Sequence, residues 1–311
     1  MQIHLASFKN FLEHNLFKTD IHYLKNINRG GSSINFVCNV KNEKFIIKAI
    51  KKDYFERAQR LCDILNSLKS EPLIYTAYAK DFDGKFIFEY ENWLILVIEY
   101  IDGCNINNNQ LNTEIIDKIC LSYKHFKNLK INALAQKDSN KIYLETKDKL
   151  NELLSNNKSF IKCKILQSMY RLNEKLKSEI LLKQEPQIIH GDASLNNLLK
   201  DKNNQIAILD FELARLGYPI EDWAEFLISS LFQNQIFFFS TKKLKHLVCH
   251  LNTLFNFTRQ DWQYGINLYF LNLLNKRSKA RKLFKSIRKA YLFTFNHRKL
   301  DAINKMLDSI Y

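Results

Sequence analysis

The sequence predicts an α+β protein of two lobes, in which an antiparallel β-rich N-lobe precedes a mainly helical C-lobe. Short β-rich runs broken by Gly, Ser and Asn fill residues 1–101, whereas most of residues 102–311 show the helical spacing of apolar side chains. The length agrees with two domains, because a single domain typically has about 100 to 200 residues and this chain has 311.

The first lobe has the pattern of an antiparallel meander with one helix. Apolar and β-branched runs bounded by turn residues are expected as strands, starting at residue 21 and at 36–40, 45–50, 74–80, 85–90 and 93–100. The last run is continuous enough in Leu, Ile and Val to be a central strand. After the third run, apolar residues within 53–68 have the spacing of one helical face, so a helix is expected there.

The lobe boundary is expected after residue 101, where the pattern changes. Asp102 and Gly103 end the last strand, and a polar, asparagine-rich connection follows. Helices are expected at 113–129, 141–154, 159–182 and from 222 onward, with a β-rich interruption at 188–213. The domains are therefore predicted as residues 1–101 and 102–311.

The composition is typical of a globular cytoplasmic protein. Hydrophobic residues make up 46% and charged residues 25% of the chain, and six scattered cysteines without a CxxC pair favour reduced thiols. The N-terminus lacks the features of a signal peptide. The longest apolar run, 93–98, is far shorter than the roughly 20 residues of a membrane-spanning helix.

The charge balance bears on partners rather than on fold. Lys and Arg number 47 against 32 Asp and Glu, giving a formal net charge of +15. This charge suits anionic lipid or a phosphorylated substrate, and equally a solvated surface without a specific anionic partner; nucleic acid is not expected. A basic helix predicted at 276–289 could bind an anionic lipid surface, nucleic acid or a phosphorylated substrate, and a peripheral contact with the inner membrane surface is therefore open; a solvated helix face is the alternative.

The strongest chemical signal is the segment IIHGDASLNNLLK at 188–200. Asn197 follows Asp192 by five residues, and apolar residues on both sides indicate a polar loop between buried strands. Phosphoryl transfer needs a carboxylate that orients the attacking hydroxyl and accepts its proton, with an amide oxygen nearby on a metal ion. A turn in which Asp192 caps a backbone amide is the structural alternative.

A second carboxylate follows in IAILDFELA at 206–214, where an apolar strand ends in Asp210. A carboxylate at a strand end can hold Mg²⁺ across the β- and γ-phosphates of ATP, with Asn197 as the partner ligand. An Asx turn would explain Asp210 alone. The order and short spacing of the two segments favour the catalytic interpretation.

The motif HGDxxxxN followed by an apolar strand and DFE resembles the catalytic and metal-binding loops of the aminoglycoside phosphotransferase and choline kinase family. The run LARLGYPIEDWAEF extends the likeness through Gly217, Pro219, Asp222 and Ala224. Protein kinases are more distant, because they carry HRD and DFG at these places. The resemblance implies a two-lobed protein-kinase-like fold with ATP and Mg²⁺ as cofactors.

The resemblance also implies roles for single residues. Asp192 would be the catalytic base, and Asn197 and Asp210 the metal ligands. Lys48, on the third expected strand, stands where family members place a basic residue that binds phosphate. A lysine facing water is the alternative for Lys48.

The turn RGGSSIN, between the first two expected strands, can lie over phosphates through its backbone amides. The usual family pattern has its asparagine one residue earlier than Asn35. Contacts are therefore expected from Gly30, Gly31, Ser32 and Ser33.

An acid on the following helix would hold Lys48 in place in a kinase-like fold. Glu56 is assigned this role, with Asp63 as the alternative. A solvated helix face is also open, since Arg57 and Arg60 are near enough to pair with either acid.

The run LILVIEYIDG resembles the strand and hinge that join the two lobes in the family. By this likeness the Glu99 carbonyl and the Ile101 amide would bind the adenine edge of ATP. A core strand that ends in a turn is the structural interpretation of the same run.

The expected function is transfer of the γ-phosphate of ATP to a hydroxyl of a small molecule such as an amino-sugar, a sugar or an envelope glycolipid. Aminoglycosides, choline and ethanolamine are alternative acceptors. Since a polycation suits a protein of charge +15 poorly, a neutral or anionic acceptor is expected. A catalytically silent binding module is the alternative of another class, and it would lack one of the catalytic residues.

Overall fold

The computed structural model divides into two compact units. Unit 1 comprises Met1–Ala133 and Asn196–Ala214, and unit 2 comprises Leu134–Leu195 and Arg215–Tyr311. The structure describes residues 3–29, 33–107, 110–129, 139–156, 166–167, 169–171, 173–174, 185–232, 241–278, 303–305 and 307–311. The division differs from the boundary expected after residue 101, because a later segment of the chain returns to the β-rich unit.

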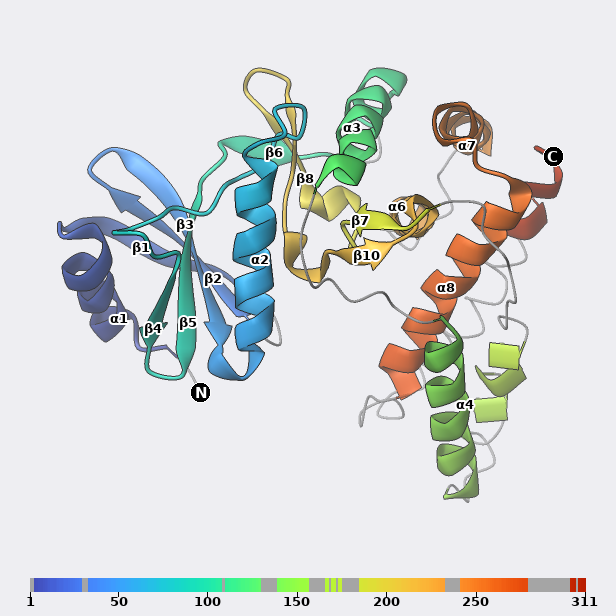
Figure 1. The fold of residues 1–311 in the computed structure, drawn as a ribbon, viewed down its shortest axis with the longest axis horizontal. Coiled ribbons are helices and arrows are strands. Elements are labelled where there is room, and N and C mark those ends of the chain that lie inside the picture. Colours follow the sequence, from blue (N-terminus) through green and yellow to red (C-terminus); the bar gives the residue numbers. More distant parts are fainter. Residues whose placement is uncertain are drawn as a thin grey trace. The chain divides into compact units, whose positions relative to one another are not determined.

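Unit 1 is built on an antiparallel sheet of five strands in the order β1-β2-β3-β5-β4 (Figure 1). The strands are β1 (Ile21–Arg29), β2 (Ser33–Val40), β3 (Glu43–Lys51), β4 (Ile87–Tyr90) and β5 (Trp93–Glu99). The expected meander is thus confirmed, and β5 is an inner strand as predicted. Lys48 of β3 lies opposite Asn35 of β2 and Leu96 of β5, so it is in the middle of the sheet.

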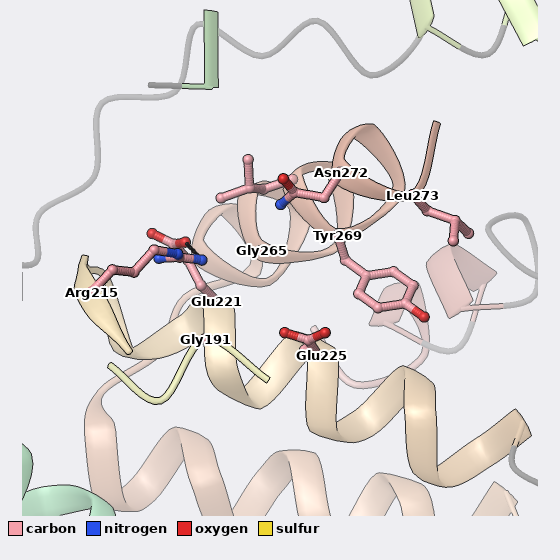
Figure 2. Close-up of a pocket in the computed structure, with 9 residues that line it drawn as sticks. Gly191, Arg215, Glu221, Glu225, Gly265, Tyr269, Asn272 and Leu273 are labelled. Atoms are coloured by element: carbon pink, nitrogen blue, oxygen red, sulfur yellow. Dashed lines mark ion pairs between the residues drawn. The ribbon is translucent and has the colours of Figure 1, made fainter. Parts of the chain in front are cut away.

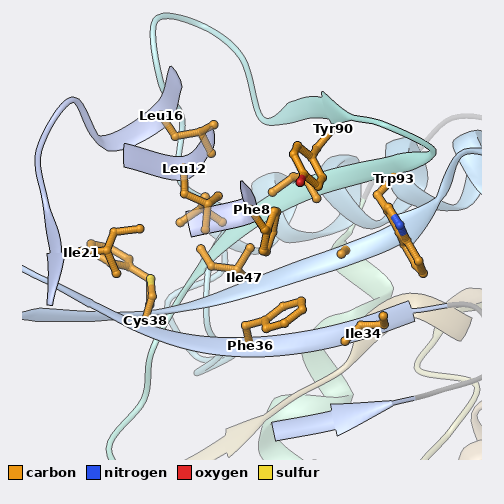
Figure 3. Packing of buried hydrophobic residues seen from close by; sticks show 14 of the residues in the cluster. Phe8, Leu12, Leu16, Ile21, Ile34, Phe36, Cys38, Ile47, Tyr90 and Trp93 are labelled. Carbon is orange, nitrogen blue, oxygen red and sulfur yellow. The ribbon is translucent and has the colours of Figure 1, made fainter. Parts of the chain in front are cut away.

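One face of this sheet is covered by α1 (Leu5–Leu12), which the sequence analysis did not predict (Figure 3). Phe8 of α1 is fully buried, with its ring centroid 5.1 Å from that of Phe36. Ile47 of β3 belongs to the same apolar cluster. Because successive side chains of a strand point to opposite faces, Lys48 projects to the other side of the sheet.

Helix α2 (Phe55–Leu68) lies on the side of the sheet opposite to α1 (Figure 1). Its Leu61, Ile64 and Leu65 are buried, as the spacing of apolar residues predicted. The face of the sheet that carries Lys48 is therefore the face covered by α2.

The rest of unit 1 is a small sheet with helical segments. Its elements are the π-helical turn η1 (Glu13–Phe17), the 3₁₀ turns η2 (Lys52–Tyr54), η3 (Phe126–Asn128), η4 (Leu195–Asn197, which begins in unit 2) and η5 (Phe211–Leu213), helix α3 (Thr113–His125), and strands β6 (Gly103–Asn105), β8 (Leu198–Asp201) and β9 (Ile206–Ile208). The three strands form a sheet in the order β6-β8-β9. The β-rich interruption expected at 188–213 is thus present.

The strand expected at 74–80 is wrong, because this segment does not form a regular ladder. The Glu99 N–H donates to the Tyr78 carbonyl at 3.0 Å, whereas the Ile208 N–H donates to the Tyr75 carbonyl at 2.9 Å. The segment therefore divides its backbone hydrogen bonds between β5 and β9.

Unit 2 is mainly helical. Its elements are α4 (Ser139–Ser155), β7 (Gln187–Ile189), β10 (Arg215–Gly217), α6 (Pro219–Phe232), α7 (Thr241–Phe255) and α8 (Arg259–Ser278). Helix α8 packs against both α4 and α6, and β7 pairs with β10 in antiparallel fashion. Helices were also expected at 159–182 and 276–289, but most residues of both ranges lie outside the described residues. None of the described helices combines the length and apolar character needed to cross a membrane.

Candidate active site

The HGD loop follows β7 in unit 2 and is held by one buried carboxylate. Asp222 of α6 accepts the backbone N–H of His190 at 2.6 Å and that of Gly191 at 2.8 Å. Gly191 has a φ of +74°, a left-handed conformation that glycine adopts without steric cost. The Asp192 N–H in turn donates to the His190 ring at 3.3 Å. The backbone that carries Asp192 is thus fixed within unit 2.

Asp222 holds this loop from a fully buried position. Burial raises the pKa of its carboxyl group, while His190 and the two N–H donors act in the opposite direction. An apolar side chain here would leave both buried N–H groups without a partner, which is costly. Sequence reasoning found Asp222 only through the resemblance, and its role as the anchor of the loop comes from the structure.

Asn197 and Asp210 lie together in unit 1. The Leu209 N–H donates to the Asn197 carbonyl at 2.8 Å, which ties the residue before Asp210 to the HGDxxxxN segment. Asp210 has a φ of +65°, which an aspartate tolerates better than most residues. Its neighbour Phe211 is buried against Phe126, with ring centroids 5.8 Å apart, and this packing holds the turn in place.

The Lys48 ammonium lies between two acids of unit 1. Its Nζ is 2.9 Å from Asp210 Oδ1 and also pairs with Glu212 Oε1. The other carboxylate oxygen of Glu212 pairs with the Arg57 guanidinium of α2. Glu56 is exposed on α2, so the expected pairing of Glu56 with Lys48 is wrong: at this level the helix presents Arg57 to the ion-pair cluster instead.

Glu212 is the residue that sequence reasoning missed. It is the third residue of the DFE motif, and its side chain is only 6% exposed. A buried charge needs a charged or hydrogen-bonding partner. The position of this acid directly after an apolar phenylalanine was therefore the signal in the sequence that it could be buried and paired with a cation. The alternative partner considered for Lys48, Asp63, is exposed and accepts a hydrogen bond from Gln59 at 3.0 Å.

A cavity of about 380 Å³ within unit 1 brings together three of the expected nucleotide-binding residues and both expected metal ligands. Lys48, Asn197 and Asp210 line it together with Glu99 and Ile101. Among the described residues, none accepts a hydrogen bond from the Ile101 amide, which leaves this donor available for a ligand.

Gly103, at the end of the run LILVIEYIDG, must be a glycine for steric reasons, and this run lies within unit 1 rather than between the two units. A Cβ atom on Gly103 would lie 2.1 Å from Leu199 Cδ2 and 2.5 Å from the Lys200 carbonyl oxygen. Gly103 also lines the unit 1 cavity, so the close approach of β6 to β8 shapes one wall of that cavity.

Of the four residues expected to contact phosphate in the RGGSSIN turn, one is described. Gly30, Gly31 and Ser32 lie outside the described residues. Ser33 begins β2, faces Ile50 of β3, and is not among the residues that line the cavity. The phosphate contacts of this turn stay a prediction.

The oxygen atoms offered by this cavity suit a hard divalent cation. Asp210 supplies a carboxylate that is 44% exposed, and Asn197 supplies an amide oxygen on the same cavity. Mg²⁺ in phosphoryl-transfer sites is held by one or two such groups together with the phosphates of the substrate. The residues present therefore fit the expected Mg²⁺ and ATP.

Comparison with known proteins identifies the family. The sequence profile of the phosphotransferase enzyme family, APH, matches residues 24–238. The chain belongs to this family. It is therefore a phosphotransferase, and the resemblance found in its motifs is confirmed. No curated protein sequence matches the phosphotransferase.

Solved structures share the fold of this phosphotransferase. Spectinomycin phosphotransferase in complex with ADP and spectinomycin is 13% identical, with a TM-score of 0.71 over 94% of each chain. An aminoglycoside phosphotransferase from Alicyclobacillus acidocaldarius is 14% identical, with a TM-score of 0.64 over 93% of this chain and 91% of its own. Amicoumacin kinase, in complex with AMP-PNP, Ca²⁺ and its ligand, is 14% identical, with a TM-score of 0.64 over 92% and 88%. The expected α+β kinase-like fold is thereby confirmed.

A second cavity, of about 100 Å³, lies in unit 2 of the phosphotransferase and is lined by Gly191 of the HGD loop (Figure 2). Arg215 and Glu221 form a buried ion pair at 2.8 Å on one side of it. Glu225 of α6 and Tyr269 of α8 line another side (Figure 2). Burial raises the pKa of Glu221, and the Arg215 charge opposes this effect.

Proposed function

We propose that this phosphotransferase transfers the γ-phosphate of Mg²⁺-bound ATP to a hydroxyl of a small molecule. The observation that carries the proposal is that one cavity of unit 1 is lined by a buried cation, Lys48, by two side chains with oxygen atoms, Asn197 and Asp210, and by Glu99 and Ile101. This set of groups matches the needs of a nucleotide: an edge for adenine, a cation for phosphates and oxygens for a metal.

Each residue has a defined part in the proposed reaction. Asp192 accepts the proton of the attacking hydroxyl, from a loop that Asp222 holds rigid. Lys48 orients the α- and β-phosphates, and Asn197 and Asp210 hold the metal. When bound, Mg²⁺ neutralises the charge that develops on the transferred group. Positioning and charge stabilisation then supply most of the rate.

The acceptor is proposed to be a neutral or anionic hydroxyl compound, such as a sugar or the sugar of an envelope glycolipid. The net charge of +15 supports this class, since it attracts anions and repels polycations. In the unit 2 cavity, Arg215 and Glu221 form an ion pair, so together they present no net charge to an acceptor. The same basic charge supports a peripheral contact with an anionic membrane surface on the cytoplasmic side.

An acceptor that carries an amine is the second candidate, and one observation favours it. Glu225 and Tyr269 line the unit 2 cavity beside Gly191. A carboxylate and an aromatic face are both groups that bind an ammonium ion, and short-range contacts outweigh the net charge of the whole protein.

An acceptor screen tests the proposal. The purified enzyme would be given Mg²⁺, ATP and separate panels of neutral sugars, acidic sugars, amino alcohols and aminoglycosides, and ADP release would be followed together with the mass of the product. Turnover with at least one hydroxyl compound is expected, and it should vanish in Asp192→Ala and Asp210→Ala. Asp192→Ala should still bind ATP. Wild-type turnover in either variant would overturn the proposed roles, and a wild-type protein that binds ATP without transfer to any panel would favour a silent binding module.

A further inference from the structure

The buried carboxylate of Glu212 is clamped between two cations from different elements of unit 1. Lys48 of β3 pairs with one carboxylate oxygen, and Arg57 of α2 pairs with the other. The Glu212 and Lys48 side chains are 6% and 7% exposed, and that of Arg57 is 25% exposed. These three residues, here called the clamp, connect α2 with the loop that carries Asp210.

The clamp reverses the charge order expected from the sequence. From the sequence, an acid on α2 was expected to pair with Lys48 directly, as the glutamate of the corresponding helix does in protein kinases. In this structure the acid comes from the DFE segment, and α2 supplies a cation that holds the acid. Among the described residues, these ion pairs connect Lys48 to α2 through Glu212.

We propose that Arg57 is a positioning residue for the nucleotide, which acts by holding Glu212 in the orientation that directs Lys48 toward the phosphates. The inference rests on the proposed function. It assigns to Arg57 of this chain the part that Glu56 was expected to play, by a different chemical route.

Charge balance gives the physical reason. With Arg57 in place, the two acids Glu212 and Asp210 face two cations, so Lys48 is shared between the acids. Without Arg57, Glu212 would keep Lys48 as its only clamp partner and draw the ammonium away from Asp210. The cluster would also gain one net negative charge beside the nucleotide cavity, which disfavours an anionic ligand. Both effects weaken the binding of phosphates.

The guanidinium shape matters as well as its charge. Arginine presents a planar set of donors that fits a carboxylate, whereas lysine carries a compact charge on a flexible stem. Arg57→Lys should therefore keep the charge balance but orient Glu212 less well, and it should have an effect between those of wild type and Arg57→Gln.

The experiment compares the Kd for ADP in the variants Arg57→Gln and Arg57→Lys. The matched control is Arg60→Gln, because Arg60 lies about one turn after Arg57 in α2. Calorimetry with ADP alone, without metal or acceptor, measures the clamp directly. Arg57→Gln is expected to raise the Kd for ADP by roughly 10- to 100-fold, Arg57→Lys by less, and Arg60→Gln by under about twofold. In turnover assays the KM for ATP should rise, while the KM for the acceptor stays unchanged.

A double substitution distinguishes positioning from a general structural role. If Arg57 acts through Glu212, Arg57→Gln combined with Glu212→Gln should bind ADP no more weakly than Glu212→Gln alone. Unchanged ADP affinity in folded Arg57→Gln, or additive losses in the double variant, would overturn the inference. Should Arg57→Gln fail to fold, the same comparison with Arg57→Lys decides it. A wild-type protein that binds no ADP would instead contradict the proposed function.

Discussion

Two buried carboxylates, Asp222 and Glu212, hold the groups proposed for chemistry. Asp222 fixes the backbone around Asp192, and Glu212 holds Lys48. The sequence identified Asp192, Lys48 and Asp210 as candidates because their motifs are local. The contact of Glu212 with Lys48 joins distant parts of the chain, so no local pattern could reveal it.

The Asp222 anchor can be tested with Asp222→Asn. The amide group is nearly isosteric, but its NH₂ would face one of the two backbone N–H donors, leaving a buried donor unpaired. The variant should lose about 1 to 3 kcal/mol in the free energy of unfolding, measured by urea titration. Its kcat should fall while its Kd for ADP, which is set in unit 1, stays near the wild-type value. A kcat equal to that of wild type would show that the loop needs no anchor.

The Lys48 ammonium should matter far more than an ordinary surface charge. Lys48→Ala removes a buried cation from the cavity proposed to bind the nucleotide, and it leaves Glu212 and Asp210 without this shared partner. The KM for ATP is expected to rise at least 10-fold, whereas Lys202→Ala, at an exposed position of the same unit, should change it less than twofold. Equal effects of the two substitutions at saturating acceptor would identify Lys48 as the wrong lysine.

At the level of elements, apolar runs bounded by turn residues predicted most of the sheet and placed Lys48 on its third strand. Strands β2, β3 and β5 each pair with a neighbour on both sides, so they are inner strands of the sheet. Inner strands are rich in apolar residues, and for this reason their apolar runs predicted them. The segment 74–80 has a similar composition but divides its bonds between two sheets, which composition does not encode. Helix α1 was not predicted, because its eight residues are too few for the helical spacing of apolar side chains to stand out.

The packing of α1 predicts a large effect of a single truncation. Phe8→Ala would empty a fully buried site between α1 and the sheet, at a cost of about 3 to 5 kcal/mol. Leu5→Ala, in the same helix but with Leu5 46% exposed, should cost under about 1 kcal/mol. Urea denaturation followed by fluorescence would measure both. Similar losses in the two variants would mean that α1 contributes through helix formation rather than through burial.

For the whole molecule, the sequence indicated two parts but could not divide them correctly. The segment Asn196–Ala214 belongs to unit 1 although it follows Leu134–Leu195 of unit 2. A boundary drawn where the composition changes assumes that the chain passes from one unit to the other only once. The later segment returns to unit 1 because β8 pairs with β6. As a result, the metal ligands proposed here share a unit with Lys48, and the proposed base belongs to the other unit.

The buried cysteines of unit 1 offer a test of nucleotide binding, with an exposed cysteine of unit 2 as the reference. Cys38, Cys62 and Cys120 of unit 1 are buried, and burial raises the pKa of each thiol to about 12. Cys249 of unit 2 is exposed. Because the thiolate is the reactive form, a thiol reagent should reach the three buried cysteines only when unit 1 opens, and Cys249 at once.

Nucleotide binding should therefore protect one group of cysteines and not the other. A ligand that binds only the folded state adds about 2.7 kcal/mol of stability at a concentration of 100 times its Kd. If opening of unit 1 is in rapid equilibrium, ADP at that concentration should slow labelling of Cys38, Cys62 and Cys120 by about 100-fold at moderate urea. The rate at Cys249 should not change. Mass spectrometry of labelled peptides reads each site separately, and unchanged labelling of Cys38, Cys62 and Cys120 at this ADP concentration would contradict the proposed cavity.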